Sequence, residues 1–276
     1  MHFDNEIITS RNNQLVKWAS SLCDKKNRRD SGYFMAEGVK LTKEAFEAGL
    51  SVEYCIVTEN KKSAICEFLS DFESDVRYEK CRVVTVSDSV FEKISTEKAP
   101  QGVISVIKHL DFFRDLDIIY KEEFFLEPEE KAIFLFSVRD PSNLGAVIRS
   151  SVAFGTDHII LSGDCADIYN PKTVRSAMGS LFRVKITTVR DVPSFISAAK
   201  ENSRRIFAAE LTDSAVSLSD IGLKNTDIVM IGNEGHGIDK SVSSICSGSV
   251  YIPISKKTES LNASVAAAIF MWEQSK

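Results

Sequence analysis

The stretch AIFLFSVRDPSNLGAVIRSSVAF, residues 132–154, joins an apolar run to a helical pattern through a short polar turn. Its first part, Ala132 to Val138, predicts a buried strand, and Leu144 to Phe154 predicts a helix. Two more strand and helix pairs follow, at His158 to Leu161 with Lys172 to Gly179, and at Arg183 to Val189 with Pro193 to Ala199. This alternation indicates an α/β fold.

Three further strands and a closing helix complete the second half. They are expected at Arg205 to Ala209, Asp227 to Ile231, Val250 to Ile254 and, for the helix, from about Leu261 to Trp272. Regular alternation with short connections predicts a mostly parallel sheet covered by helices. In such sheets ligands bind beyond the carboxyl ends of the strands. Functional residues are therefore expected directly after each strand.

The first 110 residues predict a separate, small α/β domain. The expected elements are helices at Gln14 to Leu22, Gly38 to Ala48, Lys61 to Leu69 and Val90 to Ile94, and strands near Tyr33 to Glu37, Tyr54 to Val57, Arg82 to Val86 and Gly102 to Ile107. A polar, acidic stretch follows, which we interpret as a linker over residues 111–131. The expected domains are therefore 1–110 and 132–276.

Composition excludes some classes of protein. With 43% hydrophobic and 26% charged residues, the 276-residue chain can bury substantial cores. No apolar run reaches the roughly 18 residues of a membrane span, and the start lacks a secretory pattern, so a cytoplasmic protein is expected. The six cysteines form no C-x-x-C pair, which favours free thiols over a metal site.

A net charge of −5 gives no overall attraction to nucleic acid, so any such contact requires local basic patches. One cluster follows the first helix: Lys25, Lys26, Arg28 and Arg29. Such a cluster can be a solvated helix end, favoured by the helix dipole, or a binding site for RNA phosphates.

A first candidate motif follows the strand Ala132 to Val138. Asp140, Ser142 and Asn143 can each cap a helix, and a well-capped helix is the plain structural interpretation. Arg149, six residues after Asn143, is an isolated charge in a helix of small and apolar residues. An arginine there can extend to solvent, or its guanidinium can bind phosphate.

The second motif, Gly232 to Gly237, follows the strand Asp227 to Ile231. Its three glycines allow close approach to a ligand, and Asn233 and Glu234 supply polar contacts there. The spacing differs from the G-x-G-x-x-G of dinucleotide-binding folds, which disfavours an oxidoreductase. His236 could act as a general base, but a loop histidine is more often inert, and we leave it out of the catalytic set.

The third motif begins the last helix. Ser260 and Asn262 crowd the start of this helix, where both are competent caps. Leu261, Val265, Ile269 and Trp272 fall on one apolar face, which predicts the packed side of an amphipathic helix.

Together, these three segments resemble the motifs of the SpoU (TrmH) branch of the trefoil-knot RNA methyltransferases. That family's motifs read approximately N-x-G-A-x-x-R, G-x-E-x-x-G, and an apolar-proline segment followed by S-L-N-x-S-x-A. Residues 143–149, 232–237 and 252–266 fit them without a gap, with Ala263 as a mild departure. The resemblance implies a knotted, mostly parallel sheet with flanking helices, S-adenosylmethionine as cofactor, and a homodimer.

The resemblance also implies roles for residues. Gly232, Ile252 and Leu261 match cofactor-contacting positions. The catalytic set is Asn143, Arg149, Glu234, Ser260 and Asn262. An arginine pKa above about 12 makes Arg149 a poor base, so we interpret it as a phosphate clamp. The reaction implied is 2′-O-methylation of RNA ribose.

The first domain is similar to the ribosomal-protein-like substrate-binding domain found ahead of this catalytic unit. The looser patterns that carry this similarity are Ile8-Thr9-Ser10 with Asn13, Val16 and Lys17, then Phe34 with Glu37-Gly38, and Pro100-Gln101-Gly102. This similarity favours the RNA interpretation of the basic cluster. It also favours large-subunit ribosomal RNA as the substrate. Transfer RNA remains an alternative, as does a non-catalytic RNA-binding protein of ribosome assembly.

Overall fold

The computed structural model describes residues 1–119, 122 and 124–276 and divides them into two compact units. The first unit comprises residues 1–110 and 167–182, and the second comprises residues 111–166 and 183–276. Residues 167–182, which the sequence placed in the second domain, therefore group by their contacts with the first unit. Residues 120, 121 and 123 of the expected linker lie outside the described residues.

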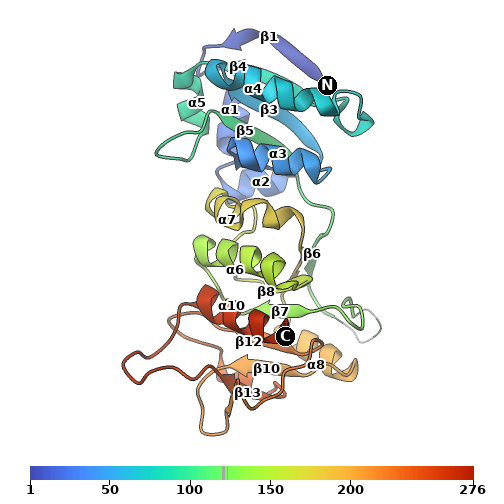
Figure 1. The fold of residues 1–276 in the computed structure, drawn as a ribbon, viewed down its shortest axis with the longest axis vertical. Helices are drawn as coiled ribbons and strands as arrows, with labels where there is room; N and C mark the ends of the chain where they lie inside the picture. The colour runs from blue at the N-terminus through green and yellow to red at the C-terminus, as the bar shows by residue number, and fades with distance from the viewer. Residues whose placement is uncertain (120–121, 123) are drawn as a thin grey trace. The chain divides into compact units, whose positions relative to one another are not determined.

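The first unit is built on a mixed five-stranded sheet in the order β1-β4-β3-β5-β2 (Figure 1). Its strands are β1 (His2–Ile8), β2 (Tyr33–Glu37), β3 (Val52–Thr58), β4 (Arg82–Val86) and β5 (Val103–Lys108). Its helices are α1 (Gln14–Ser21), α2 (Lys25–Ser31), α3 (Val39–Glu47), α4 (Glu59–Leu69), α5 (Asp88–Ile94) and α7 (Pro171–Ala177), with short 3-10 turns η1 (Ser70–Phe72), η2 (Val76–Tyr78) and η4 (Met178–Phe182).

Strand β1 and helix α2 of this unit were not expected. Strand β1 pairs in parallel with β4, and its register shifts between Phe3 and Ile7. The basic cluster forms its own helix, α2, because Asp24 accepts hydrogen bonds from Lys26 N and Asn27 N, and Gly32 ends the helix at φ 76°.

The second unit contains an eight-stranded sheet in the order β11-β13-β10-β12-β7-β8-β9-β6, in which every recorded pair among the described residues is parallel. Its strands are β6 (Phe113–Leu116), β7 (Ala132–Leu135), β8 (His158–Ser162), β9 (Lys185–Val189), β10 (Ile206–Ala209), β11 (Val216–Ser217), β12 (Ile228–Ile231) and β13 (Gly248–Tyr251). The expectation of a mostly parallel sheet is confirmed. Strand β6 lies in the segment that was expected to be a linker.

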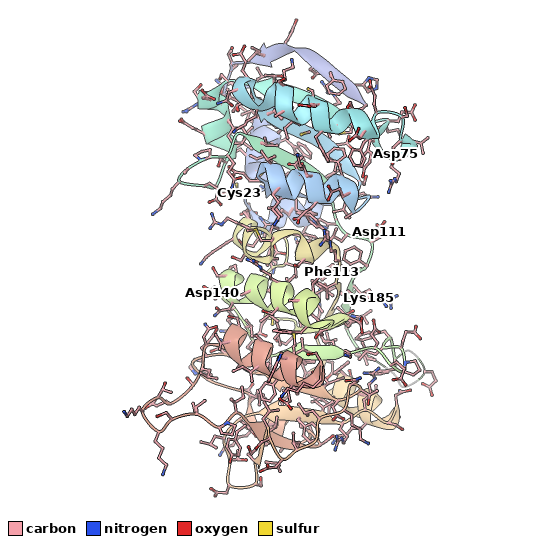
Figure 2. All side chains as sticks on the ribbon, in the orientation of Figure 1. Cys23, Asp75, Asp111, Phe113, Asp140 and Lys185 are labelled. Carbon is pink, nitrogen blue, oxygen red and sulfur yellow. The ribbon has the colours of Figure 1, made fainter. Side chains whose placement is uncertain are left out.

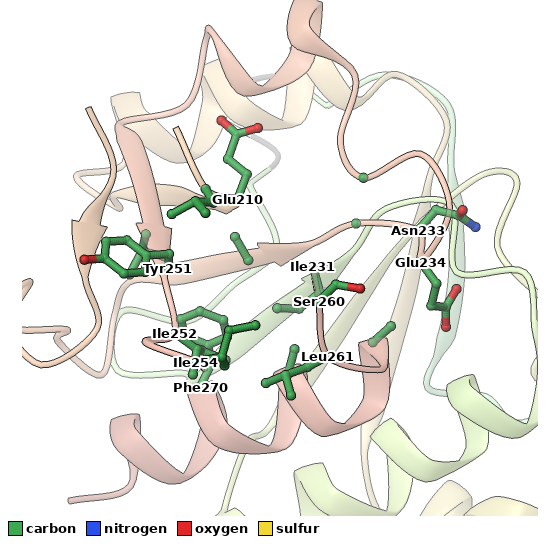
Figure 3. Close-up of a pocket in the computed structure, with 17 residues that line it drawn as sticks. Glu210, Ile231, Asn233, Glu234, Tyr251, Ile252, Ile254, Ser260, Leu261 and Phe270 are labelled. Carbon is green, nitrogen blue, oxygen red and sulfur yellow. The ribbon is translucent and has the colours of Figure 1, made fainter. Parts of the chain in front are cut away.

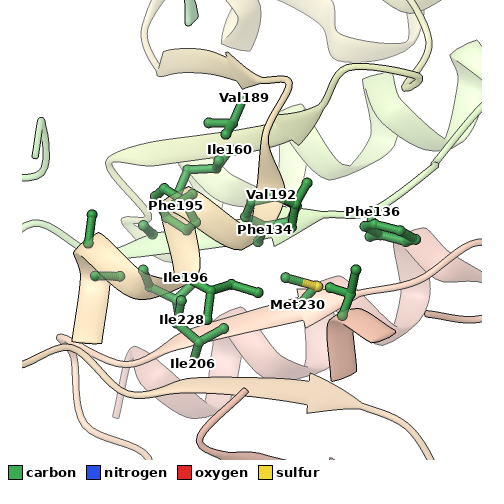
Figure 4. Packing of buried hydrophobic residues seen from close by; sticks show 14 of the residues in the cluster. Phe134, Phe136, Ile160, Val189, Val192, Phe195, Ile196, Ile206, Ile228 and Met230 are labelled. Carbon is green, nitrogen blue, oxygen red and sulfur yellow. The ribbon is translucent and has the colours of Figure 1, made fainter. Parts of the chain in front are cut away.

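The helices of this unit are α6 (Pro141–Phe154), α8 (Val192–Glu201), α9 (Lys240–Ser243) and α10 (Ala263–Gln274). Helix α8 closes one face of the sheet, where Phe195 and Ile196 pack on Phe134 and Ile160 from the strands (Figure 4). Helices α6 and α10 pack against each other. Burial of this aromatic and aliphatic cluster fixes the sheet whose strand ends carry the motifs.

The packed face of helix α10 differs from the one expected from the sequence. The buried residues are Ala263, Ala267, Phe270, Met271 and Gln274. On the other face, Val265 is 47% exposed and Trp272 is 49% exposed. The helix is apolar nearly all round, so periodicity could not tell which side faces the sheet.

No helix within the described residues is long and apolar enough to cross a membrane.

Candidate active site

Helix α6 begins directly beyond the carboxyl end of β7, at Asp140, which Figure 2 labels. Asp140 Oδ1 accepts hydrogen bonds from Ser142 N at 2.7 Å and Asn143 N at 3.1 Å. Pro141 occupies the first turn, where its missing N–H costs nothing. The cap fixes the helix start and so places Asn143 at the edge of the sheet.

Helix α10 begins in the same way. Asn262 Oδ1 accepts from Ser264 N at 3.0 Å and from Val265 N at 3.4 Å, while its Nδ2 stays available. That Nδ2 donates to Asn143 Oδ1 at 3.1 Å. One side chain therefore both starts α10 and reaches the start of α6.

A hydrogen-bonded chain joins the three sequence motifs. Asn262 donates to Asn143, and Asn143 Nδ2 in turn donates to Glu234 Oε1. Along the chain, Glu234 lies 91 positions and Asn262 lies 119 positions after Asn143. The structure thus brings together three of the five expected catalytic residues.

The loop that carries Glu234 is closed tightly on itself. Asn233 N donates to Gly237 O at 3.1 Å, and Gly237 N donates to Asn233 O at 2.9 Å. A Cβ on Gly232 would lie 2.5 Å from the carbonyl carbon of Gly237, so no larger residue fits there without a backbone shift. Close backbone approach is the physical reason for the glycine.

Beside this loop lies a pocket of about 260 Å³ (Figure 3). Its lining includes all three expected cofactor residues: Gly232, Ile252 and Leu261. Glu234 and Ser260 of the expected catalytic set also line it. The volume lies close to the lower end of the range for small-molecule sites, about 300 Å³. The walls come from the ends of β10, β12 and β13 and from the start of α10.

The sequence did not single out Glu210, which follows β10 and also lines the pocket. Its Oε1 accepts from Ser249 Oγ at 2.7 Å, which holds the carboxylate in place. Figure 3 shows Glu210 and Glu234 at opposite ends of the pocket. The rule that ligands bind beyond strand ends could have identified Glu210, because Ala209 ends β10.

Arg149 lies on α6 and is exposed. No hydrogen bond or ion pair of its guanidinium is found among the described residues, so its charge is directed to solvent. The structure does not join Arg149 to Asn143, Glu234 or Asn262 within this chain. His236 is exposed as well, and its backbone N–H donates to Asn233 Oδ1 at 3.3 Å.

The basic cluster of α2 needs one correction. Lys25, Lys26 and Arg29 are exposed, as a phosphate-binding role requires. Arg28 is only 2% exposed, and its Nη2 donates to Asp167 Oδ2 at 2.6 Å. Its Nη1 donates to the carbonyls of Leu22 and Cys23. Arg28 therefore stabilises the first unit and is not available to RNA.

Comparisons with known families agree with this geometry. The model of the SpoU rRNA Methylase family matches residues 130–272, which is more than half of the 276-residue chain. The model of the MRM3-like substrate binding domain matches residues 13–105. The two matches fall on either side of the segment 111–129.

Two curated relatives span nearly the whole chain. One is the Bacillus subtilis 23S rRNA (guanosine(2553)-2′-O)-methyltransferase RlmP, 29% identical, with 96% of this chain and 97% of the relative covered. Another is the Streptomyces viridochromogenes 23S rRNA (uridine(2479)-2′-O)-methyltransferase, 28% identical, with 96% and 90% covered.

A solved structure shares the fold over almost the full length. The AdoMet-bound rRNA methyltransferase from Sinorhizobium meliloti aligns with a TM-score of 0.81 at 26% identity, covering 98% of this chain and 97% of that one. Three motifs joined by hydrogen bonds at one sheet edge, a family match over that same region and this structural likeness lead to one conclusion: the chain belongs to the SpoU rRNA methylase family.

Proposed function

We propose that this chain transfers a methyl group from S-adenosylmethionine to a ribose 2′-hydroxyl of RNA, with large-subunit ribosomal RNA as the substrate. The observation that carries the proposal is the hydrogen-bonded chain Asn262–Asn143–Glu234 beside the pocket. The named activities of the Bacillus and Streptomyces relatives support both the reaction and the substrate.

The residues that line the pocket suit this cofactor in polarity and charge. Ile252, Leu261 and Phe270 offer an apolar surface for a purine ring. Carboxylates at the two ends, Glu210 and Glu234, complement a ligand that carries a sulfonium and an ammonium group. When bound, S-adenosylmethionine supplies an electrophilic methyl group. The residues around it hold and orient both reactants.

Positioning is the main task of the polar residues, since aligning two reactants can supply much of the rate acceleration. We assign Asn143, Ser260 and Asn262 to the orientation of the ribose and Glu234 to holding the cofactor loops. Arg149 carries a permanent charge that suits a phosphate of the RNA, and the proton leaves to that phosphate or to water.

We further propose that two copies pair through the second unit. Val265 and Trp272 leave half of their side chains exposed on α10, a helix that is apolar nearly all round. Pairing would cover this face and could bring Arg149 of one copy, which has no partner among the described residues, to the site of the other. The change Trp272→Glu should then lower the mass measured by sedimentation from dimer to monomer.

We assign residues 1–110 to RNA binding and residues 132–276 to catalysis. Lys25, Lys26 and Arg29 are the exposed cations of α2 that would contact phosphates. Replacing these three cations should weaken RNA binding and its dependence on salt, without changing affinity for the cofactor. A matched control is Lys61→Ala on α4, which removes one exposed cation outside this cluster.

The decisive experiment is a map of ribose 2′-O-methylation in ribosomal RNA from cells with and without the gene. Loss of one site in the large-subunit RNA, restored by the wild-type gene and not by Arg149→Ala, supports the proposal. If every ribosomal site persists and a transfer RNA site disappears, the substrate is transfer RNA. Absence of cofactor binding in calorimetry would instead favour a non-catalytic assembly protein.

A further inference from the structure

Ser137 connects the ends of three neighbouring strands. It follows β7, which lies between β12 and β8 in the sheet. Its N–H donates to Ser162 Oγ at 2.8 Å and its Oγ donates to Asp164 Oδ2 at 2.7 Å, both at the end of β8. Its carbonyl accepts from Asn233 Nδ2 at 2.9 Å, at the end of β12.

Asp164 closes a ring of hydrogen bonds around Ser137. Ser162 Oγ donates to Asp164 Oδ1 at 2.7 Å, and Arg139 Nη2 donates to Asp164 Oδ2 at 2.8 Å. Partial burial acts to raise the pKa of Asp164, but the bonds from Arg139, Ser137 and Ser162 outweigh it and lower the pKa to about 2. The carboxylate is therefore ionised at working pH and can only accept, which fixes the direction of both hydroxyls.

The backbone of Ser137 requires this support. Its φ of 55° lies in the left-handed region, which glycine adopts freely and other residues rarely do. The bonds from its side chain and its N–H hold this conformation. They also direct its carbonyl towards Asn233.

Asn233 connects Ser137 to the loop that carries Glu234. Its Oδ1 accepts from Gly235 N at 2.8 Å and from His236 N at 3.3 Å, so its side chain organises the loop on which Glu234 lies. Glu234 in turn accepts from Asn143. Asp164, Ser137 and Asn233 thus form a continuous path of contacts to the polar chain of the site.

We propose that Asp164 is a positioning residue for methyl transfer, which acts through Ser137 and Asn233 on the loop that carries Glu234. The proposal rests on the proposed function of the site. Asp164 is not among the residues that line the pocket, so it has no contact of its own with a ligand there. Its effect reaches the reactants only through the loop.

The test compares Asp164→Asn and Ser137→Gly with a matched control, Asp115→Asn. Asp115 accepts from Arg190 Nη2 at 2.7 Å, and its side chain is 43% exposed against 44% for Asp164. Both aspartates thus lose a similar exposed pairing with arginine, but Asp115 lies on β6 and has no contact with Ser137. Ser137→Gly removes the hydroxyl at a position whose φ suits glycine.

In steady-state assays, Asp164→Asn and Ser137→Gly should lower kcat at least about tenfold, since a shift near 1 Å in reacting groups can cost a hundredfold. KM for RNA should stay within about twofold, whereas KM for S-adenosylmethionine should rise severalfold, because the disturbed loop lines the cofactor pocket. Hydrogen exchange in the peptide 232–238 should be faster in both variants. Asp115→Asn should leave kcat and this exchange unchanged.

The proposal would be overturned if Asp164→Asn left kcat unchanged or raised KM alone. It would also be overturned if Asp115→Asn lowered kcat as much as Asp164→Asn does. Unchanged exchange at residues 232–238 would overturn it too, because the constraint would not reach the loop. If the wild-type protein methylates no RNA, the proposed function fails, whereas faster exchange in the variants would still establish the path from Asp164 to the loop.

Discussion

The side chain of Asn262, at the start of α10, donates a 3.1 Å hydrogen bond to the side chain of Asn143, in the first turn of α6. The two residues lie 119 positions apart, yet each is part of a separate helix cap. The two helix starts are therefore fixed relative to each other by a contact between two candidate catalytic residues.

Asn143→Ala removes both bonds of this side chain and should lower kcat by about a hundredfold, because Glu234 and Asn262 lose their common partner. Affinity for S-adenosylmethionine should fall only severalfold, since Asn143 does not line the pocket. Single-turnover methyl transfer with calorimetry of cofactor binding measures both. Ser142→Ala, on the neighbouring residue, is the control, and an equal loss there would implicate the helix start instead.

The three motifs could be recognised from the sequence because their residue types and spacing together resemble the motifs of one family, and the first two follow strands with clear apolar runs. Asn143, Glu234 and Asn262 were expected at one sheet edge, and the hydrogen bonds join them there. Asp164 and Ser137 were not expected. The role of Ser137 depends on its positive φ, and a residue pattern does not predict this backbone conformation for a serine.

Two other features of the structure could not be predicted from residue patterns: the burial of Arg28 and the packed face of α10. Arg28 shares its charge and spacing with its exposed neighbours, and only the tertiary contact with Asp167 distinguishes it. Helix α10 is apolar on both faces, so the choice of Phe270 and Met271 for the core depends on the shape of the sheet beneath. Contacts between residues far apart in the sequence determine both the burial of Arg28 and the packed face of α10.

Arg149→Ala should reduce methyl transfer to background while cofactor affinity stays within about twofold, because the exposed guanidinium has no bond within the described chain to lose. Arg149→Lys should recover little, since an ammonium cannot form the paired bonds of a guanidinium to phosphate. Transfer of labelled methyl groups to ribosomal RNA gives the rate. His236→Ala should remain near normal, and a collapse with a shifted pH profile would instead identify His236 as the general base.

Glu130 should contribute acid-sensitive stability. Its carboxylate is buried and accepts from Lys185 Nζ at 2.8 Å, and it contacts His158 Nδ1 at 3.3 Å. Burial acts to raise its pKa, but these contacts outweigh it and lower the pKa from 4.5 to about 2. A lowered pKa stabilises the fold above the unfolded value, and this stabilisation is lost as the pH falls towards about 2.

Glu130→Gln should therefore lower the free energy of unfolding by on the order of 2–3 kcal/mol at pH 7. The difference from wild type should shrink steadily as the pH falls from 4.5 to about 2, the interval bounded by the unfolded and folded pKa values. Urea unfolding at several pH values measures it. The exposed neighbour Glu129, changed to Gln, should show no such trend, and a pH-independent difference for Glu130→Gln would contradict the charge-based explanation.

Gly232→Ala tests whether the tight loop shapes the cofactor pocket. The added Cβ would lie 2.5 Å from the carbonyl carbon and 2.6 Å from the carbonyl oxygen of Gly237, and backbone atoms cannot move aside as a flexible side chain can. The loop must therefore shift at the wall that Gly232 and Gly237 share. Affinity for S-adenosylmethionine in calorimetry should fall by about tenfold or more, as expected for a loss above roughly 1.4 kcal/mol.

Gly235→Ala, in the same loop, is the matched control, because its Cβ would meet only Asn233 Oδ1 at 3.4 Å, an ordinary contact. Equal affinities for the two variants would mean that the loop yields freely, and that its closure by Asn233 and Gly237 does not determine the pocket.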